Sequence, residues 1–297
     1  MQTLRLYAYI DEIARTGSIR QAAERLSITP SALNRRVIAL EQELGVEVFE
    51  RLGRGVRLST AGELLIDMMR KHLADTETLK SRIADLSGLR RGHVSVACSQ
   101  AVLPNFMPAE ISKYQSQYPM VTFSILNKEG KEAAEALLNY SVDLAIVLDH
   151  LPHSEFQTAL AVPQPIYAVF RKSHPLASRS KVTFSDCLEY PLALPTAQYG
   201  VRKTLETLAD HKTTRLQPTI EADSYVLLQK YVECTDAIGF ELKIGAPMAS
   251  NSALISRPLQ FTRTMPGHLH IVHLKSRTLP VAVARFAQQI SETLSHE

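Results

Sequence analysis

The chain has 297 residues, of which 45% are hydrophobic and 21% are charged, the composition of a soluble globular protein with two or three domains. Its formal net charge of +3 is too small to indicate a nucleic-acid partner without a local basic patch. The N-terminal stretch contains acids and no cleavage site, and no apolar run approaches the roughly 18 residues of a membrane span. We therefore expect a cytoplasmic protein with no membrane partner.

The first 45 residues show the pattern of two helices joined by a very short turn. Apolar residues at helical spacing predict a first helix that Gly17 ends. Ser18 caps a second helix rich in alanine, and a third helix follows with Thr29 as its cap and Pro30 at its first position. Alanine allows the second and third helices to cross closely, so this segment predicts a helix-turn-helix.

The third helix is predicted to turn one face inward and the other outward. The inward face consists of Leu33, Val37, Leu40 and Leu44, and the outward face of Ser31, Asn34, Arg35 and Ile38. Arginine and asparagine can bond guanine and adenine edges in the DNA major groove, and serine can bond phosphate. From Arg15 to Leu40 five arginines and one acid give a local charge of 5 − 1 = +4. The alternative is an ordinary solvated helix face.

A small β-hairpin, or wing, is predicted directly after these helices. Gly53 and Gly55 allow a tight reversal between two short apolar segments. Arg51, Arg54 and Arg57 are then placed to meet the DNA backbone or the minor groove.

Residues 3–70 resemble, without a gap, the N-terminal domain of bacterial LysR-type transcriptional regulators. The blocks AAERL, LEQELGVEVFER and LSTAG carry this resemblance, which implies a winged helix-turn-helix with its recognition helix over residues 29–40. Pro30 stands where the family often has glutamine and Asn34 where it usually has serine, whereas Arg35 matches. The expected partner is double-stranded operator or promoter DNA, with RNA polymerase as a further one. The predicted DNA-binding residues are Ser18, Thr29, Pro30, Ser31, Asn34, Arg35, Arg36, Arg51 and Arg54.

A long helix, capped by Thr60 and running to about Leu86, is predicted next. Its seam residues are Leu65, Met68, His72, Thr76, Leu79, Ile83 and Leu86, spaced three or four apart. A helix of roughly 40 Å could not be stabilised by the small domain before it alone. We therefore expect a homodimer, or the homotetramer that the family resemblance implies; the alternative is a helix lying along its own domain.

Strands and helices alternate from residue 90 onward. The runs HVSVAC, VTFSIL and DLAIVL predict a parallel sheet of βαβ units, and the runs from PIYAVF to DAIGFE predict a second. Two such sheets form a two-lobed α/β body with a cleft at their switch points. The order of elements resembles the effector domain of the same family, which is like a type II periplasmic binding protein.

The predicted fold is therefore α/β, with an N-terminal all-α winged helix-turn-helix, a long linker helix and a two-lobed effector domain. The predicted domains are residues 1–59 for DNA binding, 60–88 for the linker and dimerisation helix, and 89–297 for effector binding. By the family resemblance, lobe I comprises residues 89–162 and 267–297, and lobe II comprises residues 163–266.

Polar and aromatic residues at strand ends are the candidates for the effector cleft. Ser99 and Gln100 follow the first strand and precede a helix, where a hydroxyl and backbone donors would meet a carboxylate. The complete predicted set is Ser99, Gln100, Leu148, Thr196, Gln198, Tyr199 and Phe240. Its aromatic members suggest a partly apolar or aromatic carboxylate, or a ligand of similar size. The alternative for each residue is an ordinary turn or strand position.

The sequence gives little support for metal, disulfide, redox or cofactor chemistry. His268 and His270 share one face of a strand while His273 points to the other, so no metal site is expected. Cys98, Cys187 and Cys234 lie far apart with no CxxC pair, so the sequence suggests neither a disulfide framework nor a thiolate zinc site. Cys98 is predicted to be a buried small hydrophobe, with a redox sensor as the alternative. No cofactor motif is found.

The leading function is a DNA-binding regulator that responds to a small-molecule effector. A redox-responsive regulator that uses Cys98 is the first alternative. A solute-binding protein would share the C-terminal architecture but would carry an export signal and no helix-turn-helix. An enzyme on the same two-lobed fold would need a polar catalytic cluster that the sequence does not show.

Overall fold

A computed structural model describes residues 2–86, 91–148, 151, 154–210, 216–248, 252–260 and 267–296. The chain divides into two compact units, Met1–Ser87 and Gly88–Glu297. Within the described ranges, no helix combines the length and the hydrophobicity needed to cross a bilayer.

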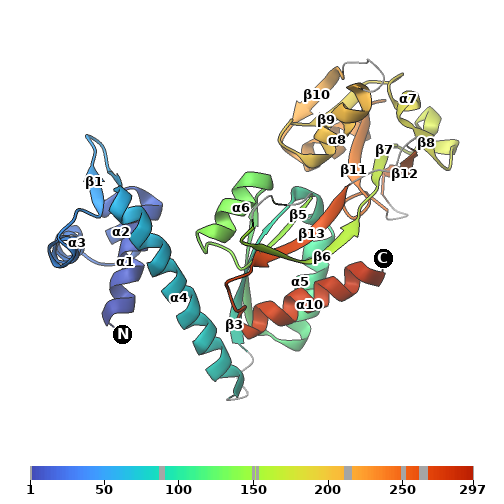
Figure 1. The fold of residues 1–297 in the computed structure, drawn as a ribbon. Helices are drawn as coiled ribbons and strands as arrows, with labels where there is room; N and C mark the ends of the chain where they lie inside the picture. Colours follow the sequence, from blue (N-terminus) through green and yellow to red (C-terminus); the bar gives the residue numbers. More distant parts are fainter. Residues whose placement is uncertain are drawn as a thin grey trace. The chain divides into compact units, whose positions relative to one another are not determined.

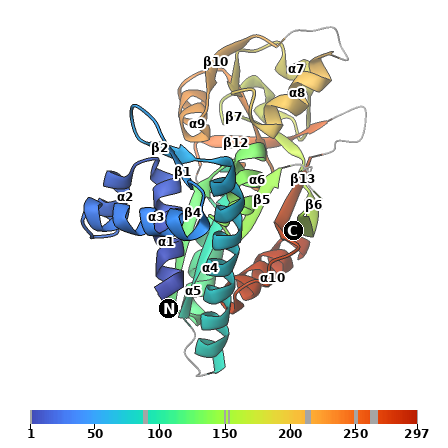
Figure 2. The same cartoon turned by 60° about the vertical axis from the view of Figure 1, so that its left-hand side comes forward.

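The N-terminal unit is a bundle of helices with a short hairpin (Figures 1 and 2). Its elements are α1 (Gln2–Thr16), α2 (Ile19–Arg25), α3 (Pro30–Leu44), β1 (Phe49–Arg51), β2 (Val56–Leu58) and α4 (Thr60–Leu86). In both views α1 runs alongside α4. The hairpin of β1 and β2 is antiparallel, with Glu50 opposite Arg57.

The local signals predicted for the two central helices are confirmed. The Ser18 hydroxyl accepts a hydrogen bond from the Gln21 amide at 3.4 Å, and the Thr29 hydroxyl accepts one from the Ala32 amide at 3.3 Å. The shared core contains Ile10, Ile13, Ala22, Ala23, Leu33, Val37 and Leu40. Leu44 was wrongly predicted to join them, because it is 44% exposed in the last turn before the left-handed Gly45.

The wing packs against the turn between α1 and α2. Gly55 has a φ of +91°, and a Cβ atom there would lie 2.5 Å from the Gly17 carbonyl oxygen. That same oxygen accepts a hydrogen bond from the Val56 amide at 2.8 Å. Glycine at position 55 is therefore required both by the backbone conformation and by the close approach.

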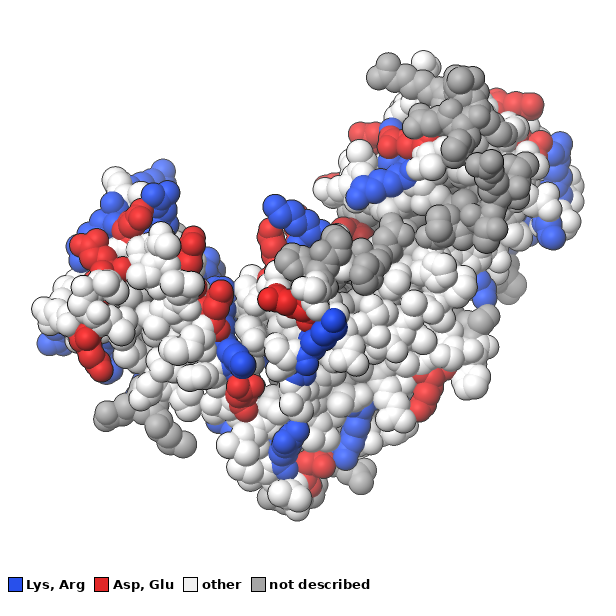
Figure 3. Space-filling model, viewed as in Figure 1, with Lys and Arg blue, Asp and Glu red and all other residues white. Residues whose placement is uncertain are grey.

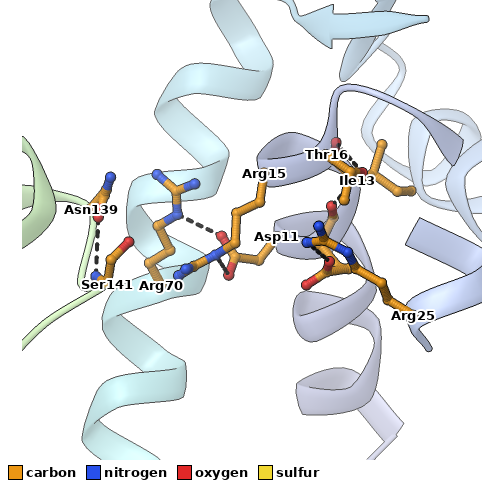
Figure 4. A network of polar contacts seen from close by, with 9 residues as sticks. Asp11, Ile13, Arg15, Thr16, Arg25, Arg70, Asn139 and Ser141 are labelled. Atoms are coloured by element: carbon orange, nitrogen blue, oxygen red, sulfur yellow. Dashed lines mark hydrogen bonds and ion pairs between the residues drawn. The ribbon is translucent and has the colours of Figure 1, made fainter. Parts of the chain in front are cut away.

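An ion-pair network joins α1 to α4. One Asp11 carboxylate oxygen accepts from Arg15 at 2.7 Å, and the other accepts from Arg70 of α4 at 2.6 Å (Figure 4). The side chains of Asp11 and Arg70 are only 13% and 14% exposed, so this pair is shielded from water. The predicted cap of α4 is corrected by one residue: Thr60 opens the helix, and the Ser59 hydroxyl accepts from the Gly62 amide at 3.0 Å.

Lobe I of the C-terminal unit contains a five-stranded sheet in the order β4-β3-β5-β13-β6. Its strands are β3 (Arg91–Cys98), β4 (Met120–Asn127), β5 (Leu144–Leu148), β6 (Phe156–Pro163) and β13 (His268–Leu274). Its helices are η1 (Gln100–Val102), α5 (Phe106–Gln117), α6 (Gly130–Leu138) and α10 (Val281–His296). Helices α5 and α10 share one hydrophobic core with the sheet, and α6 packs into a second.

Lobe II contains a six-stranded sheet in the order β10-β9-β11-β7-β12-β8. Its strands are β7 (Ile166–Arg171), β8 (Val182–Thr183), β9 (Leu192–Pro195), β10 (Pro218–Ala222), β11 (Ile238–Leu242) and β12 (Leu254–Gln260). Its helices are η2 (Pro175–Ser178), α7 (Phe184–Cys187), α8 (Gly200–Asp210) and α9 (Tyr225–Cys234). Residues from α7, α8 and α9 join one core with these strands.

Both sheets are mixed, whereas the sequence predicted parallel ones. Strands β3, β4 and β5 are parallel, and β13 runs antiparallel to β5 and β6; β7 likewise runs antiparallel to β11 and β12. Strand β7 follows β6 of lobe I and β13 follows β12 of lobe II, so neither continues a βαβ unit within its own sheet and no βαβ rule sets its direction. The chain leaves lobe I between Pro163 and Ile166. The predicted domain boundaries near residues 88–89 and 266 lie outside the described residues.

Candidate functional site

Helix α3 presents a polar face that is not used by its own core. Ser31, Arg35 and Arg36 are exposed, and Asn34 is half-buried. The Ser31 hydroxyl lies 3.3 Å from that of Thr29, at the exposed N-terminus where Pro30 begins the helix. This face therefore offers hydroxyl, amide and guanidinium groups on one rigid element.

Seven arginines of the N-terminal unit fall into two groups. Arg15, Arg20, Arg25 and Arg57 form ion pairs with Asp11, Glu24, Glu12 and Glu50, respectively. In the described part of the chain, Arg35, Arg51 and Arg54 form no ion pair and no side-chain hydrogen bond, and all three are exposed. Figure 3 shows basic side chains around the wing. Unneutralised cations are therefore found on α3 and on the wing.

Two of the predicted DNA-binding residues also have a structural role. The Arg36 guanidinium lies 5.3 Å from the centre of the Tyr9 ring, a cation–π contact within its own unit. The Ser18 hydroxyl caps α2. Contact of either residue with DNA stays a prediction.

In lobe I, the residues that follow two neighbouring parallel strands come together. Cys98 at the end of β3 pairs with Asn127 at the end of β4. The Ser99 hydroxyl donates to the Glu129 carboxylate at 2.6 Å, and the Gln100 amide donates to the same oxygen at 3.2 Å. Ser99 is 4% exposed, whereas Gln100 and Glu129 are half-buried, so this arrangement is partly shielded from water.

Lobe II meets this cluster through the N-terminus of α9. The Tyr225 amide donates to the Gln100 side-chain carbonyl at 3.0 Å, a direct hydrogen bond between the two lobes. The Tyr199 and Tyr225 rings pack edge to face with centres 5.6 Å apart, and the Tyr199 hydroxyl donates to the Asp223 carbonyl at 2.8 Å. We call the set Ser99, Gln100, Glu129, Tyr199 and Tyr225 the lobe junction.

Acidic side chains act on the two phenols of the lobe junction. Burial raises the pKa of Tyr225 well above its ordinary value, and the charges of Glu129 and Glu241 raise it further. Burial also raises the pKa of Tyr199, to which the charges of Glu129 and Asp223 add. Among the described residues, every charged side chain that acts on these two phenols is acidic.

Glu241 is a buried acid beside the lobe junction. Glu241 is 5% exposed on β11, and burial raises its pKa to about 8. A hydrogen bond that Gln229 of α9 donates at 2.8 Å acts in the opposite direction and lowers the pKa. At neutral pH a large part of this carboxyl group is therefore protonated.

The other predicted ligand-binding residues differ from one another in their burial and in their surroundings. The Thr196 hydroxyl oxygen is inaccessible to water and has no hydrogen-bond partner among the described residues, whereas Gln198 is exposed. Leu148 ends β5 as predicted, but it is 7% exposed and packs into the core of lobe II. Phe240 was wrongly placed at the end of its strand, because β11 continues to Leu242. It packs in the core with its ring centre 6.3 Å from that of Phe184.

A cavity of about 440 Å³ lies elsewhere in the C-terminal unit. Residues of α5, of the turn 243–248 and of α10 line it, and its lining includes none of the predicted ligand-binding residues.

The residues considered for metal and redox chemistry remain apart. Within the described ranges, no three metal-ligating side chains converge. Cys98 is fully buried, and burial, followed by the charge of Glu129, raises the pKa of its thiol to about 12. The thiolate needed for fast oxidation is therefore scarce at neutral pH. Cys187 is also buried with a pKa of about 12, and Cys234 is exposed.

Glu129, Tyr225 and Glu241 were not predicted from the sequence. A signal for Glu129 was present, because it follows the end of a strand predicted to lie beside the first one. Parallel neighbours end at the same sheet edge, so the residues after both strands belong to one site. Nothing in the sequence distinguishes Glu241 from a surface acid.

Comparisons with known families cover almost the whole chain. Residues 4–63 match the family described as bacterial regulatory helix-turn-helix protein, lysR family, and residues 87–295 match the LysR substrate binding domain. The chain belongs to the LysR family. It is thus a LysR-type transcriptional regulator with a substrate-binding effector domain, which confirms the predicted family and the prediction of a regulator instead of an enzyme.

Relatives in this family are similar over nearly their full length. The uncharacterized HTH-type transcriptional regulator YbhD of Escherichia coli is 27% identical over 274 residues, which are 92% of this chain and 86% of that protein. The HTH-type transcriptional activator CmpR of Synechocystis is 23% identical over 96% of this chain and 93% of its own.

Solved structures share the fold of this LysR-type regulator. A full-length OxyR variant from Pseudomonas aeruginosa matches with a TM-score of 0.73 at 20% identity, covering 97% of this chain and 94% of that one. Full-length CbnR, solved with its target DNA, matches with a TM-score of 0.64 at 18% identity, covering 98% and 99%. The predicted combination of a winged helix-turn-helix and a two-lobed α/β domain is confirmed.

Proposed function

We propose that this LysR-type regulator binds double-stranded operator or promoter DNA through α3 and the wing, and that a small-molecule effector at the lobe junction modulates the binding. The observation that carries the first part is the exposed, unneutralised set of Arg35, Arg51 and Arg54. Residues 1–59 serve DNA binding, 60–88 join the subunits and 89–297 receive the effector. The protein acts in the cytoplasm as a homodimer or homotetramer, and RNA polymerase is a further partner at promoters.

The roles of the DNA-binding residues follow from their chemistry. Arg35 and Asn34 read base edges in the major groove, where guanine accepts a guanidinium fork and adenine matches an amide. Ser18, Thr29, Ser31, Arg36, Arg51 and Arg54 contact the phosphate backbone or the minor groove, and Pro30 fixes the start of the helix. The solved CbnR complex with its target DNA supports DNA binding by the shared fold.

Replacing Arg35 with alanine tests the placement of the recognition helix. We expect Arg35→Ala to lower discrimination between operator and unrelated DNA by about 10- to 100-fold, because a bidentate arginine–guanine contact contributes ~1–3 kcal/mol. Arg54→Ala on the wing should weaken binding to both DNAs equally. Fluorescence anisotropy with DNA upstream of the neighbouring operon measures both effects. Unchanged discrimination and affinity in Arg35→Ala would show that α3 does not read bases.

The effector part of the proposal rests on contact between the lobes. The Gln100–Tyr225 hydrogen bond shows that residues of both lobes meet where the predicted ligand-binding residues lie. A ligand that binds open and closed arrangements with different affinity shifts their populations, and so can change DNA binding. We propose Ser99, Gln100, Thr196, Gln198 and Tyr199 as effector-binding residues; Leu148 and Phe240 have weaker support because both pack in the core.

Alanine substitutions at Ser99 and Thr196 test this switch. Each variant is expected to lose the effector response of operator binding while its ligand-free DNA affinity stays within about twofold of the unaltered protein, because both residues lie far along the chain from α3. The readout is operator affinity with and without cell-extract metabolites. An unchanged response in both variants would place effector binding elsewhere, for example in the cavity beside α5.

Two finer expectations have less support from the geometry. The carboxylate effector expected from the sequence would use the Ser99 hydroxyl and the Gln100 amide, and both already donate to Glu129. A redox sensor at Cys98 is disfavoured by the burial of the thiol and its high pKa. The solute-binding alternative has no use for the helix-turn-helix.

A further inference from the structure

Glu129 occupies the position at which a ligand carboxylate was expected. Its carboxylate accepts from the Ser99 hydroxyl at 2.6 Å and from the Gln100 amide at 3.2 Å. A hydroxyl and a backbone amide are donors that an anionic ligand would use. The protein thus supplies its own anion to this anion-binding site.

A free carboxylate is a poor competitor for this position. It would have to displace Glu129 from both donors and would bring a second negative charge beside it. Like charges held close together in a buried site repel strongly because water screens them little. Ser99 and Tyr225 are both 4% exposed and Glu129 is half-buried, so water screens charges at this site only in part.

The remaining groups of the lobe junction favour a positive charge. Tyr199 and Tyr225 present aromatic rings, whose faces attract cations. Asp223, whose backbone carbonyl accepts from the Tyr199 hydroxyl, adds an acidic side chain on the side of lobe II. The buried Thr196 hydroxyl, which belongs to the turn closed by the Tyr199 amide, has no partner among the described residues. Buried polar atoms in proteins are nearly always paired, so this hydroxyl points to a missing polar ligand atom.

We infer that the lobe junction takes a cationic effector, an amine or guanidinium compound with an apolar body, and that Glu129 is its counter-ion. This inference rests on the proposed effector function, because it names the ligand class of the same junction. The cation lies between the carboxylate of lobe I and the tyrosine pair of lobe II, so that its binding holds the two lobes together. The apolar body packs on the Tyr199 and Tyr225 rings.

The test compares amines with acids of matched size on the full-length protein. Phenethylamine and putrescine are set against hydrocinnamate and succinate in titration calorimetry at neutral pH. We expect the amines to bind the unaltered protein more tightly than the acids. Glu129→Gln should weaken amine binding by at least about tenfold, which corresponds to ~1.4 kcal/mol, while Glu129→Asp should retain most of it because the charge is kept.

Glu132→Gln is the matched control. Glu132 lies in the first turn of α6, directly after Glu129, is 67% exposed and pairs with Lys128 at 3.6 Å, so its substitution should leave amine affinity unchanged. Tighter binding of the acids to the unaltered protein, no binding of either amine, or equal amine affinity in Glu129→Gln would overturn the inference. If Glu129→Gln does not fold, the order of affinities in the unaltered protein and in Glu129→Asp decides. Operator binding by the ligand-free protein tests the proposed function separately. Protein that does not bind operator DNA without a ligand would contradict that function and not the ligand class.

Discussion

Replacing Met68 and Leu79 of α4 with glutamate is expected to convert the protein into monomers that bind operator DNA at least ~100-fold more weakly. Along this helix Leu64, Met68, Leu79, Ile83 and Leu86 are 75%, 41%, 57%, 54% and 90% exposed. Burying one such side chain fully contributes about 1.5–3 kcal/mol, so a second copy of the helix would gain considerable free energy by covering the stripe.

Two buried glutamates would cancel that gain, because charges in an apolar interface lose their hydration. The loss of DNA affinity follows from linkage, since a dimer brings its second recognition helix to the DNA at high effective concentration. Light scattering and anisotropy measure the two effects. The matched control, Met68→Leu with Leu79→Met, keeps the apolar volume and should stay dimeric. A monomeric unaltered protein would contradict the prediction directly.

Glu241→Gln is expected to stabilise the protein at alkaline pH. The pKa of Glu241 is raised from 4.5 to about 8 in the folded state, so the folded protein binds more protons than the unfolded chain between these values. Stability contributed by this group is therefore intact below pH 4.5 and is lost as pH rises through about 8, at a cost on the order of a few kcal/mol.

Glutamine keeps the shape and can still accept the Gln229 hydrogen bond, but it never ionises. The melting temperature of the variant should exceed that of the unaltered protein by roughly 5–10 °C at pH ~9, and the difference should shrink toward pH ~6. Glu132→Gln, at an exposed acid, should show a constant difference. A difference that does not change with pH would mean that Glu241 is ionised throughout.

The N-terminal unit was predictable because its signals are local. The caps at Ser18 and Thr29, Pro30 at the start of α3 and the glycine turns each act within a few residues, and the structure shows each one. The free positive charge of this region was overestimated because ion pairs are not local in the sequence. Arg15 and Arg25 pair with Asp11 and Glu12, which precede the counted segment, so only spatial neighbours reveal which cations are free for DNA.

The C-terminal unit was less predictable because its sheets depend on distant pairing. Strand β6 buries only Phe156 fully, and β12 contains Pro258, so neither shows the apolar alternation of a typical strand. Phe240 was placed in the cleft because its strand was expected to end there, two residues before Leu242. The contact between Ser99 and Glu129 depends on the register of β3 and β4, which the sequence does not specify.

The shielded ion pair of Asp11 and Arg70 joins α1 to α4, so we expect the two helices to move as one rigid body. With α1 fixed to α4, the recognition helix must follow any tilt of α4 and cannot swing independently. An arm of roughly 40 Å that tilts by about 10° moves its end by roughly 7 Å, the length of about two base pairs. In the proposed dimer, a small change at the C-terminal end of α4 would therefore alter the distance between the two recognition helices. The dimer would then fit operator half-sites of a different spacing.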